Sequence, residues 1–309
     1  MKPKIRKIAV TGVSGMVGGH IVQYAASQGI SCVVTSRHRP RSLPSLAEWR
    51  SWDLCRWLEV DALDALFGNV EALLHVGAMT PRKNITIAQR DMFDANVRSC
   101  LCLGLWALQK NIPVIYLSGA VVYADPEAHQ IKENALLGYQ RGKLGGFYGV
   151  TKSLGEEVFT TLAAEGLHLC VLRPSSIYGT GLSDDQMISI FFSRGLKGED
   201  IVINAPPGSR VNLIHAADVA TAMLTVLQRG VAGTFNIAAP KTFTIVEIAQ
   251  KVLHVCGKRG IVVQQKESLK SPFLRFDLNC SAAEDAFGFA SRIGFEEGLR
   301  YMKDGAFGI

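Results

Sequence analysis

The sequence has few charged residues and no long apolar run. Charged side chains make up 19% and hydrophobic side chains 48% of the 309 residues, which excludes the composition of a disordered chain. No apolar stretch approaches the roughly 18 residues of a membrane span, so no membrane partner is expected. Internal repeats and low-complexity segments are also absent. The length suits one large core with a smaller appended lobe, since cores stop growing near roughly 250–300 residues.

Paired cysteine motifs are absent as well. The seven cysteines are an odd number, lie mainly in apolar stretches and show no CxxC spacing, which favours reduced thiols and a cytoplasmic location. The seven histidines show no zinc-ligand spacing, and we predict no metal. The formal net charge of +6 comes from dispersed basic residues without a groove-reading motif. We therefore expect a small anionic ligand rather than a nucleic-acid partner.

Short β-rich runs alternate with helix-like periodic stretches in the first half of the chain. The clearest strands are 8–11, 32–36, 72–76, 114–118 and 169–172, and helical periodicity covers 18–28, 88–110 and 148–165. This alternation predicts an α/β fold of the Rossmann type, a doubly wound parallel sheet with ligands at the carboxyl ends of its strands. We predict a Rossmann domain at 1–177, to which 211–238 return, and a smaller C-terminal substrate-binding lobe at 178–210 and 239–309.

A glycine-rich loop follows the first predicted strand. Gly12 permits a tight turn, Gly15 lets the backbone approach a pyrophosphate, and Gly18 lets helix and strand pack closely. A strand, a glycine turn and a helix in this order predict a dinucleotide-binding loop. Its expected cofactor contacts are Gly12, Ser14, Gly15, Met16, Val17 and Gly18.

The end of the second predicted strand favours a phosphorylated cofactor. NAD-selective sites usually place Asp or Glu there for the ribose 2′-hydroxyl, whereas this chain has Arg37 and Arg39. A guanidinium can bind a 2′-phosphate through two hydrogen bonds, so NADP is the expected cofactor and NAD the second choice. The alternative is a solvated basic loop. Asp53 and Leu54, which follow the next short strand, are expected at the adenine edge. The nearby tryptophans are interpreted as packing residues, namely Trp49, Trp52 and Trp57.

Tyr148 and Lys152 form a candidate acid–base pair. Their spacing of four residues puts both side chains on one face of the predicted helix. An ammonium near a phenol lowers the pKa of the tyrosine, so we expect Lys152 to lower the pKa of Tyr148. Such a phenol can give or take the proton of a substrate hydroxyl while a nicotinamide exchanges hydride. The alternative is an amphipathic helix with a surface lysine.

Seven segments follow one another in a pattern known from a single family. They are TGxxGxxG-like 11–18, HLAA-like 75–78, the pair Asn96-Val97, YxxxK at 148–152, RPxxxYG at 173–179, FVHVxDVA-like 213–220 and YNIG-like 235–238. In this order they resemble the extended short-chain dehydrogenase/reductase family, the nucleotide-sugar epimerases, dehydratases and ketoreductases. The resemblance implies further cofactor contacts from Val76, Gly77, Ala78, Asn96, Tyr148, Lys152, Pro174 and Ser175.

Two positions depart from the pattern of that family. Where the family has a Ser or Thr that hydrogen-bonds the reacting oxygen, this chain has Gly119, and losing such a donor costs about 10²–10³-fold in rate. Ser118 and Thr80 are the candidate replacements, although strand alternation points Ser118 to the other face unless the chain bends. The diphosphate-binding arginine of the family falls at Val211, one residue after Arg210. Expected substrate contacts are Thr80, Ser176, Arg210 and Asn212.

These observations predict an NAD(P)-dependent oxidoreductase of the epimerase/dehydratase type. It would act on a carbinol or keto group of a nucleotide-activated sugar, with Tyr148, Lys152 and Ser118 as catalytic residues. The alternatives are a cofactor-sensing Rossmann protein that has lost turnover and an NADPH-dependent reductase of a non-sugar carbonyl. The resemblance also implies a homodimer through the helices that begin near 88 and 148, with an apolar stripe of Leu101, Leu105 and Leu108.

Overall fold

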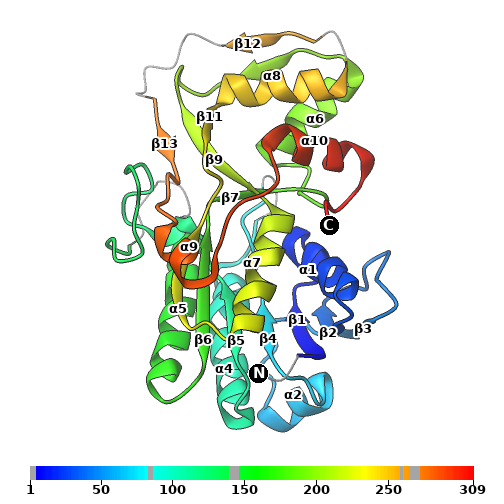
Figure 1. The fold of residues 1–309 in the computed structure, drawn as a ribbon, viewed down its shortest axis with the longest axis vertical. Coiled ribbons are helices and arrows are strands. Elements are labelled where there is room, and N and C mark those ends of the chain that lie inside the picture. The colour runs from blue at the N-terminus through cyan, green and yellow to red at the C-terminus, as the bar shows by residue number, and fades with distance from the viewer. Residues whose placement is uncertain (1–4, 83–85, 139–145, 258–259, 265–271) are drawn as a thin grey trace.

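A parallel sheet of seven strands forms the lower half of the molecule in the view of Figure 1. The computed structural model describes residues 5–82, 86–138, 146–257, 260–264 and 272–309. Along the sheet the strand order is β10-β6-β5-β4-β1-β2-β3. The strands are β1 (Lys7–Thr11), β2 (Ser31–Ser36), β3 (Ala47–Ser51), β4 (Leu73–His75), β5 (Val114–Leu117), β6 (Leu169–Pro174) and β10 (Gly233–Ile237).

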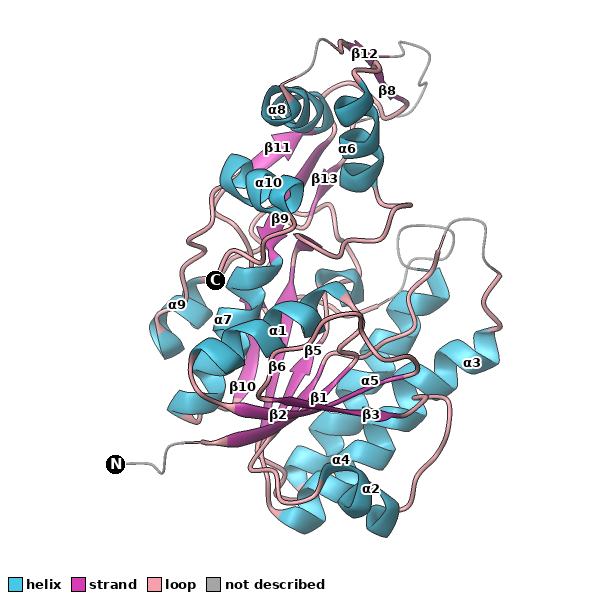
Figure 2. Cartoon of the chain, turned by 90° about the vertical axis from the view of Figure 1, so that its right-hand side faces the viewer, coloured by secondary structure: helices cyan, strands magenta, loops and turns pink. Residues whose placement is uncertain are grey.

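Helices cover both faces of this sheet, as Figure 2 shows. On one face, α1 (Met16–Ser27) and α7 (Ala216–Arg229) pack against each other over an apolar core. On the other face lie α2 (Val60–Phe67), α4 (Ser99–Lys110) and α5 (Gly146–Ala164). Because the central strands are buried on both sides, they are continuously apolar rather than alternating. The short helix α9 (Ser281–Phe287) packs beside β10.

The predicted Rossmann-type fold is confirmed. The five predicted strands correspond to β1, β2, β4, β5 and β6. The helix predicted over 88–110 changes its hydrogen bonding midway: α3 (Gln89–Phe93) leads into one π-helical turn, η1 (Asp94–Arg98), before α4 begins. The edge strand β3 corresponds to the short strand expected before Asp53, whose bounds were not predicted because its sequence Ala-Glu-Trp-Arg-Ser carries the polar residues that edge strands tolerate.

A second, smaller sheet lies above the first in Figure 1. Its central strand β9 (Arg210–His215) pairs with β7 (Ser176–Tyr178), β11 (Thr242–Thr244) and β13 (Leu274–Arg275). Around it pack α6 (Met187–Lys197), α8 (Ile245–Cys256) and α10 (Phe295–Asp304), and β8 (Ile201–Ile203) pairs with β12 (Val262–Gln264).

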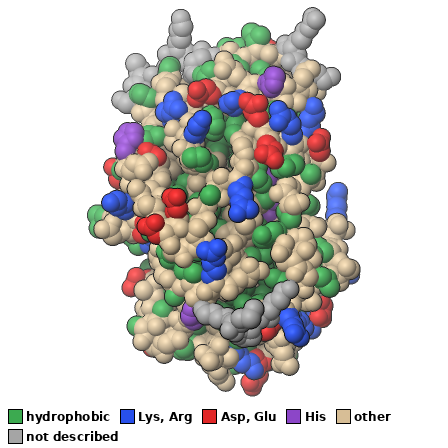
Figure 3. Space-filling view, viewed as in Figure 1, with side chains coloured by type: hydrophobic (Ala, Val, Ile, Leu, Met, Phe, Trp, Pro, Cys, Tyr) green, Lys and Arg blue, Asp and Glu red, His purple; other side chains and the backbone are tan. Residues whose placement is uncertain are grey.

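The segment 211–238, predicted to return to the Rossmann domain, divides between the two sheets. Its strand β9 belongs to the smaller sheet, since it pairs with β7 and β11, whereas α7 and β10 join the larger one. The expectation is therefore corrected for β9, and the domain boundaries stay a prediction. None of the described helices has the length and hydropathy to cross a membrane. On the face shown in Figure 3, basic and acidic side chains are interspersed rather than gathered into one patch.

Candidate cofactor and acid–base site

Two glycines let the loops after β1 and β4 approach each other closely. Gly12 has a φ of +74°, and a Cβ there would lie 2.5 Å from Cα of Gly77. A Cβ at Gly18 would lie 2.8 Å from Cα of Val13, so only glycine lets the first turn of α1 pack on this loop. The positive φ of Gly12 agrees with the tight turn predicted there, and the close approach at Gly18 agrees with its predicted packing role. The loop after β1 is thus packed closely against the loop after β4 and against α1.

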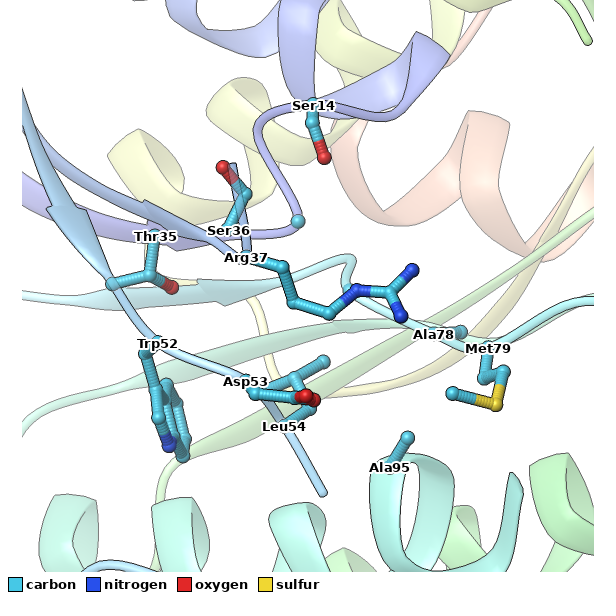
Figure 4. A pocket seen from close by; sticks show the side chains of 12 residues that line it. Ser14, Thr35, Ser36, Arg37, Trp52, Asp53, Leu54, Ala78, Met79 and Ala95 are labelled. Carbon is cyan, nitrogen blue, oxygen red and sulfur yellow. The ribbon is translucent and has the colours of Figure 1, made fainter. Parts of the chain in front are cut away.

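A pocket opens between these loops and the end of β2 (Figure 4). Its lining consists of Gly12, Ser14, Thr35, Ser36, Arg37, Trp52, Asp53, Leu54, Gly77, Ala78, Met79 and Ala95. The structure thus brings together seven of the predicted cofactor contacts, which are Gly12, Ser14, Arg37, Asp53, Leu54, Gly77 and Ala78. Figure 4 shows the guanidinium of Arg37 extending across the pocket. Arg39 is exposed and is not part of the lining.

Other predicted cofactor contacts lie in the structure around the pocket rather than at its surface. Gly15 caps the N-terminus of α1, and Met16 and Val17 belong to its first turn, where Val17 is buried in the core. Val76 packs partly buried against the same core. Sequence reasoning missed five of the lining residues, namely Thr35, Ser36, Trp52, Met79 and Ala95. All of these except Thr35 directly adjoin a predicted contact, and for Trp52 the sequence predicts only a packing role.

Asn96 joins three segments around the pocket. It is buried in η1, and its Oδ1 accepts a hydrogen bond of 2.7 Å from the backbone N–H of Met79. Its Nδ2 donates to the carbonyl oxygen of Met79 and to Oγ1 of Thr151, both at 3.0 Å. Both amide hydrogens are therefore used within the protein, and Asn96 fixes the pocket loop against α5. Direct contact with a cofactor stays a prediction for this residue.

Lys152 is buried in α5 and is turned toward the end of β5. Its Nζ donates to the carbonyl oxygen of Leu117 at 2.8 Å and lies 4.1 Å from the centre of the Tyr116 ring. Burial lowers the pKa of Lys152 to about 8, because the charged form loses water. The ring of His75 stacks on the ring of Tyr116, with 5.5 Å between the two ring centres. Burial lowers the pKa of His75 to about 3.

Tyr148 lies one turn before Lys152 on the same helix, as its spacing predicts. Burial raises the pKa of Tyr148 to about 12. The expectation that Lys152 lowers the pKa of Tyr148 is therefore wrong for this structure. The ammonium is engaged by Leu117 and Tyr116, so desolvation of the phenol prevails over attraction to the charge.

The position of the missing hydroxyl lies directly after β5. Gly119 has an extended backbone with a φ of 175°, and the nearest atom to a Cβ there would be Cγ1 of Val121 at 3.8 Å. A side chain would therefore fit. Ser118 is buried, and its Oγ has no hydrogen-bond partner among the described residues. Thr80, the other candidate donor, is exposed in the loop after β4. A catalytic role for Ser118 stays a prediction.

Asn212 and Ser175 bind each other rather than facing a pocket. Ser175 Oγ donates to Oδ1 of Asn212 at 2.7 Å, and both side chains are buried. Nδ2 of Asn212 donates to the carbonyl oxygens of Ala239 and Lys241, at 2.8 and 3.3 Å. The amide thus holds the loop after β10. The substrate contact expected of Asn212 and the cofactor contact expected of Ser175 would require these bonds to change.

The remaining predicted contacts lie along the two sheets. Pro174 ends β6 and is buried, and Ser176 begins β7 half-buried. Arg210 begins β9, where its Nη2 donates to the carbonyl oxygen of Thr242 at 2.9 Å. Part of its guanidinium is therefore already engaged. The described residues contain no group of three or more His, Cys, Asp or Glu side chains that could hold a metal ion.

Comparison with known proteins gives consistent matches. Residues 8–238 match the model of the NAD dependent epimerase/dehydratase family. The chain is similar to UDP-glucuronic acid decarboxylase 6 of Arabidopsis thaliana, with 21% identity over 304 residues, covering 96% of this chain and 88% of the relative. It is also similar to a dTDP-4-dehydro-6-deoxy-D-allose reductase of Streptomyces sp, with 25% identity over 316 residues and 96% of both chains covered.

Solved structures share the fold over nearly the whole chain. UDP-glucose 4-epimerase of Thermotoga maritima, solved with UDP-glucose, superposes with a TM-score of 0.84 at 20% identity, covering 97% of this chain and 98% of the other. UDP-glucuronic acid 4-epimerase of Bacillus cereus, in complex with UDP-glucuronic acid and NAD, gives a TM-score of 0.82 at 17% identity with the same coverage. At these identities the likeness shows the fold alone.

Proposed function

The chain belongs to the NAD dependent epimerase/dehydratase family, and from this premise we propose that it oxidises or reduces a carbinol or keto carbon of a nucleotide-activated sugar. It is an enzyme of the epimerase/dehydratase type. Relatives named as a UDP-sugar decarboxylase and a dTDP-sugar reductase support the nucleotide sugar as substrate class. The observation that carries the proposal is the glycine-lined pocket together with Tyr148 and Lys152 on one face of α5.

The pocket fits a dinucleotide. Side chains at Gly12 and Gly18 would collide with the neighbouring backbone, so glycine at these positions lets the loop pack closely against α1 and against the loop after β4. A tight glycine loop at a helix N-terminus is the arrangement that binds a pyrophosphate in dinucleotide-binding folds. Asp53 lies across the pocket from Ser14 of the glycine loop, where its carboxylate can accept a hydrogen bond from an adenine amino group. When bound there, NAD(P) would supply the acceptor or donor of hydride.

Tyr148 is the residue that transfers the proton in the acid–base step. Because its pKa is raised to about 12, the phenol keeps its proton on Oη at neutral pH. The proton is therefore present to be given to a carbonyl oxygen when the adjoining carbon is reduced, and a proton from solvent then restores the phenol. Because a raised pKa makes the phenol a weaker acid, this transfer depends on the negative charge that develops on the carbonyl oxygen. Lys152, with one N–H on the carbonyl of Leu117, has further donors for ribose hydroxyls.

Turnover with a panel of UDP-sugars, dTDP-sugars and their keto derivatives tests this function. Tyr148→Phe removes the proton and keeps the ring, so turnover should fall by about 10²–10⁴-fold while cofactor affinity is retained. Lys152→Met should weaken both turnover and cofactor binding. Unchanged turnover in Tyr148→Phe would overturn the assignment of this residue.

NADP is the proposed first choice of cofactor, and the position of Arg37 supports it. The guanidinium reaches into the pocket from the end of β2, where a 2′-phosphate of the adenosine ribose would lie. Arg37→Ala should weaken NADP binding about tenfold, which corresponds to about 1.4 kcal/mol, and leave NAD binding within about twofold. Arg39→Ala is the matched control, because Arg39 does not line the pocket. Equal affinity of the unmodified protein for both cofactors, measured by calorimetry, would contradict the preference.

We also propose a homodimer in the cytoplasm. Leucines on the outer face of α4 and α5 are 39% exposed, namely Leu101, Leu105 and Leu154. Leu108, predicted for the same stripe, instead packs partly buried against the core between sheet and helices. The seven cysteines are all free, which supports a reducing compartment.

A further inference from the structure

A hydrogen bond from the edge strand fixes the turn after β2. Trp49 in β3 pairs with Val34 of β2, which places its indole on the same face as Ser36. Nε1 of Trp49 donates to Oγ of Ser36 at 3.0 Å, and Ser36 Oγ donates to the carbonyl oxygen of His38 at 2.7 Å. The bond from Ser36 to His38 closes a turn with residue 37 at its apex, and the bond from Trp49 ties this turn to β3.

The turn determines where the two arginines that follow β2 point. Arg37 at the apex lines the pocket, whereas Arg39, two residues later, does not. In Figure 4 the side chain of Arg37 passes between Ser14 and Asp53, and its guanidinium is directed toward Ala78 and Met79. Among the described residues Arg37 has neither an ion pair nor a hydrogen bond, so its five N–H donors are available to a ligand.

Ser36 cannot serve the ligand as a donor itself. A serine hydroxyl has one proton, and that proton is used on the carbonyl of His38. One of its lone pairs is taken by the indole of Trp49. The indole ring is partly buried against the core on that face of the sheet, together with Leu43 and Ala47, so its N–H has a fixed direction. The orientation of the Ser36 hydroxyl, and with it the turn, is therefore set by Trp49.

We infer that Trp49 is a positioning residue for cofactor selectivity, which holds the turn so that Arg37 remains aimed at a 2′-phosphate. The inference rests on the proposed preference for NADP. Ordering a long side chain when the ligand binds lowers the affinity for that ligand. A turn that is already fixed before binding reduces this loss of affinity. NAD lacks the 2′-phosphate, so its binding does not depend on the position of Arg37.

The test compares dissociation constants for NADP and NAD in the full-length protein and its variants. Trp49→Phe keeps a smaller aromatic ring against the core and removes the N–H donor, and the control Trp57→Phe loses the same ring volume. It should weaken NADP binding by about three- to tenfold and leave NAD binding within about twofold. In an Arg37→Ala background the same substitution should cause no further loss, because Trp49 acts through Arg37. Trp57→Phe is the matched control, since its indole donates to Glu59 outside the pocket lining.

Each outcome distinguishes the two proposals. If the unmodified protein prefers NADP and Trp49→Phe leaves the ratio of the two constants unchanged, the role of Trp49 is overturned and the NADP preference stands. If the unmodified protein has no preference, both proposals are overturned. Should Trp49→Phe fail to fold, Ser36→Ala removes the same two hydrogen bonds without touching the core, and a thermal melt of each variant confirms folding.

Discussion

At the scale of single residues, the candidate site contains a deeply buried lysine whose positive charge has no ion-pair partner among the described residues. Lys152 is 2% exposed, and no described carboxylate forms an ion pair with it. Burial lowers its pKa from 10.5 to about 8, so below pH 8 the folded protein holds an ammonium that costs about 3 kcal/mol relative to the unfolded chain. Such a cost is typical of a group kept for function rather than for stability.

Replacing Lys152 by Met should therefore stabilise the protein at neutral pH, by up to about 3 kcal/mol in the free energy of unfolding. Between pH 8 and 10.5 the unfolded chain binds a proton that the folded protein has lost, so stability of the unmodified protein rises with pH in this window. The advantage of Lys152→Met should shrink accordingly. Urea unfolding of both proteins from pH 7 upward measures this, and a variant less stable at pH 7 would contradict it.

Gly119 is the residue that departs furthest from the family pattern, and the structure has room for a side chain at this position. The extended backbone and the 3.8 Å to Val121 allow Gly119→Ser to fold normally. Adding an oriented donor should raise turnover by up to about 10²-fold. Ser118→Ala is the control. If Gly119→Ser leaves turnover unchanged while Ser118→Ala lowers it, Ser118 already holds the reacting oxygen.

At the scale of elements, a buried ion pair ties α5 to the sheet. Nη2 of Arg173, in β6, lies 2.6 Å from Oε2 of Glu156, one turn after Lys152, and the two side chains are 6% and 5% exposed. Nη1 of Arg173 also donates to Oη of Tyr123 and to the carbonyl oxygen of Glu133. The helix that carries the acid–base pair is thereby fixed to β6 and to the chain that follows β5.

Breaking this pair should cost far more than breaking an exposed one. Glu156→Gln leaves the buried guanidinium without its countercharge and should lower the free energy of unfolding by about 3–5 kcal/mol. Glu296, paired with Arg300 at 3.7 Å on the surface, offers a comparison in Arg300→Ala, which should cost less than about 1 kcal/mol. Denaturant unfolding gives both values. A loss below about 1 kcal/mol in Glu156→Gln would show that the pair does not hold the helix.

The elements that the sequence predicts are those that local periodicity specifies. β1 and β2 are apolar because both faces are buried, and the glycine loop has a fixed spacing, so both were predictable. The bounds of β3 were not predictable, because its polar residue Arg50 is explained only by the fold. Nη1 of Arg50 donates to carbonyl oxygens near the end of α2, at Ala65 and Leu66. The π-helical turn η1 likewise leaves no signal in a helical pattern.

In the candidate site, too, some features follow from the local sequence and others depend on the assembled fold. The spacing of Tyr148 and Lys152 predicts a shared helix face, whereas their pKa values depend on how deeply the assembled sheet and helices bury them. Arg37 was predictable from its place after a strand. The hydrogen bond that Trp49 makes to Ser36 depends on the register between β2 and β3, which no local pattern gives.

At the scale of the whole molecule, exposed leucines on α4 and α5 predict association of two chains. Leu101 and Leu105 lie one turn apart on α4, and Leu154 lies on α5, which packs beside it. Introducing Glu at both Leu101 and Leu105 should convert a dimer to a monomer in sedimentation velocity at micromolar concentration. Leu196→Glu, on α6, is the control, because Leu196 is 49% exposed on a different helix. A monomeric unmodified protein would contradict the dimer.

Hydride exchange between cofactor and nucleotide sugar, with Tyr148 transferring the proton, is the most direct property to measure. Protein loaded with oxidised or reduced cofactor is mixed with UDP- and dTDP-sugars and their keto derivatives, and absorbance is followed in the reduced-nicotinamide band within one turnover. We predict that the band changes with at least one of these sugars, and that the change is at least about 10²-fold slower in Tyr148→Phe with cofactor still bound. An equally fast change in Tyr148→Phe, or no change with any of these sugars despite tight cofactor binding, would contradict this function.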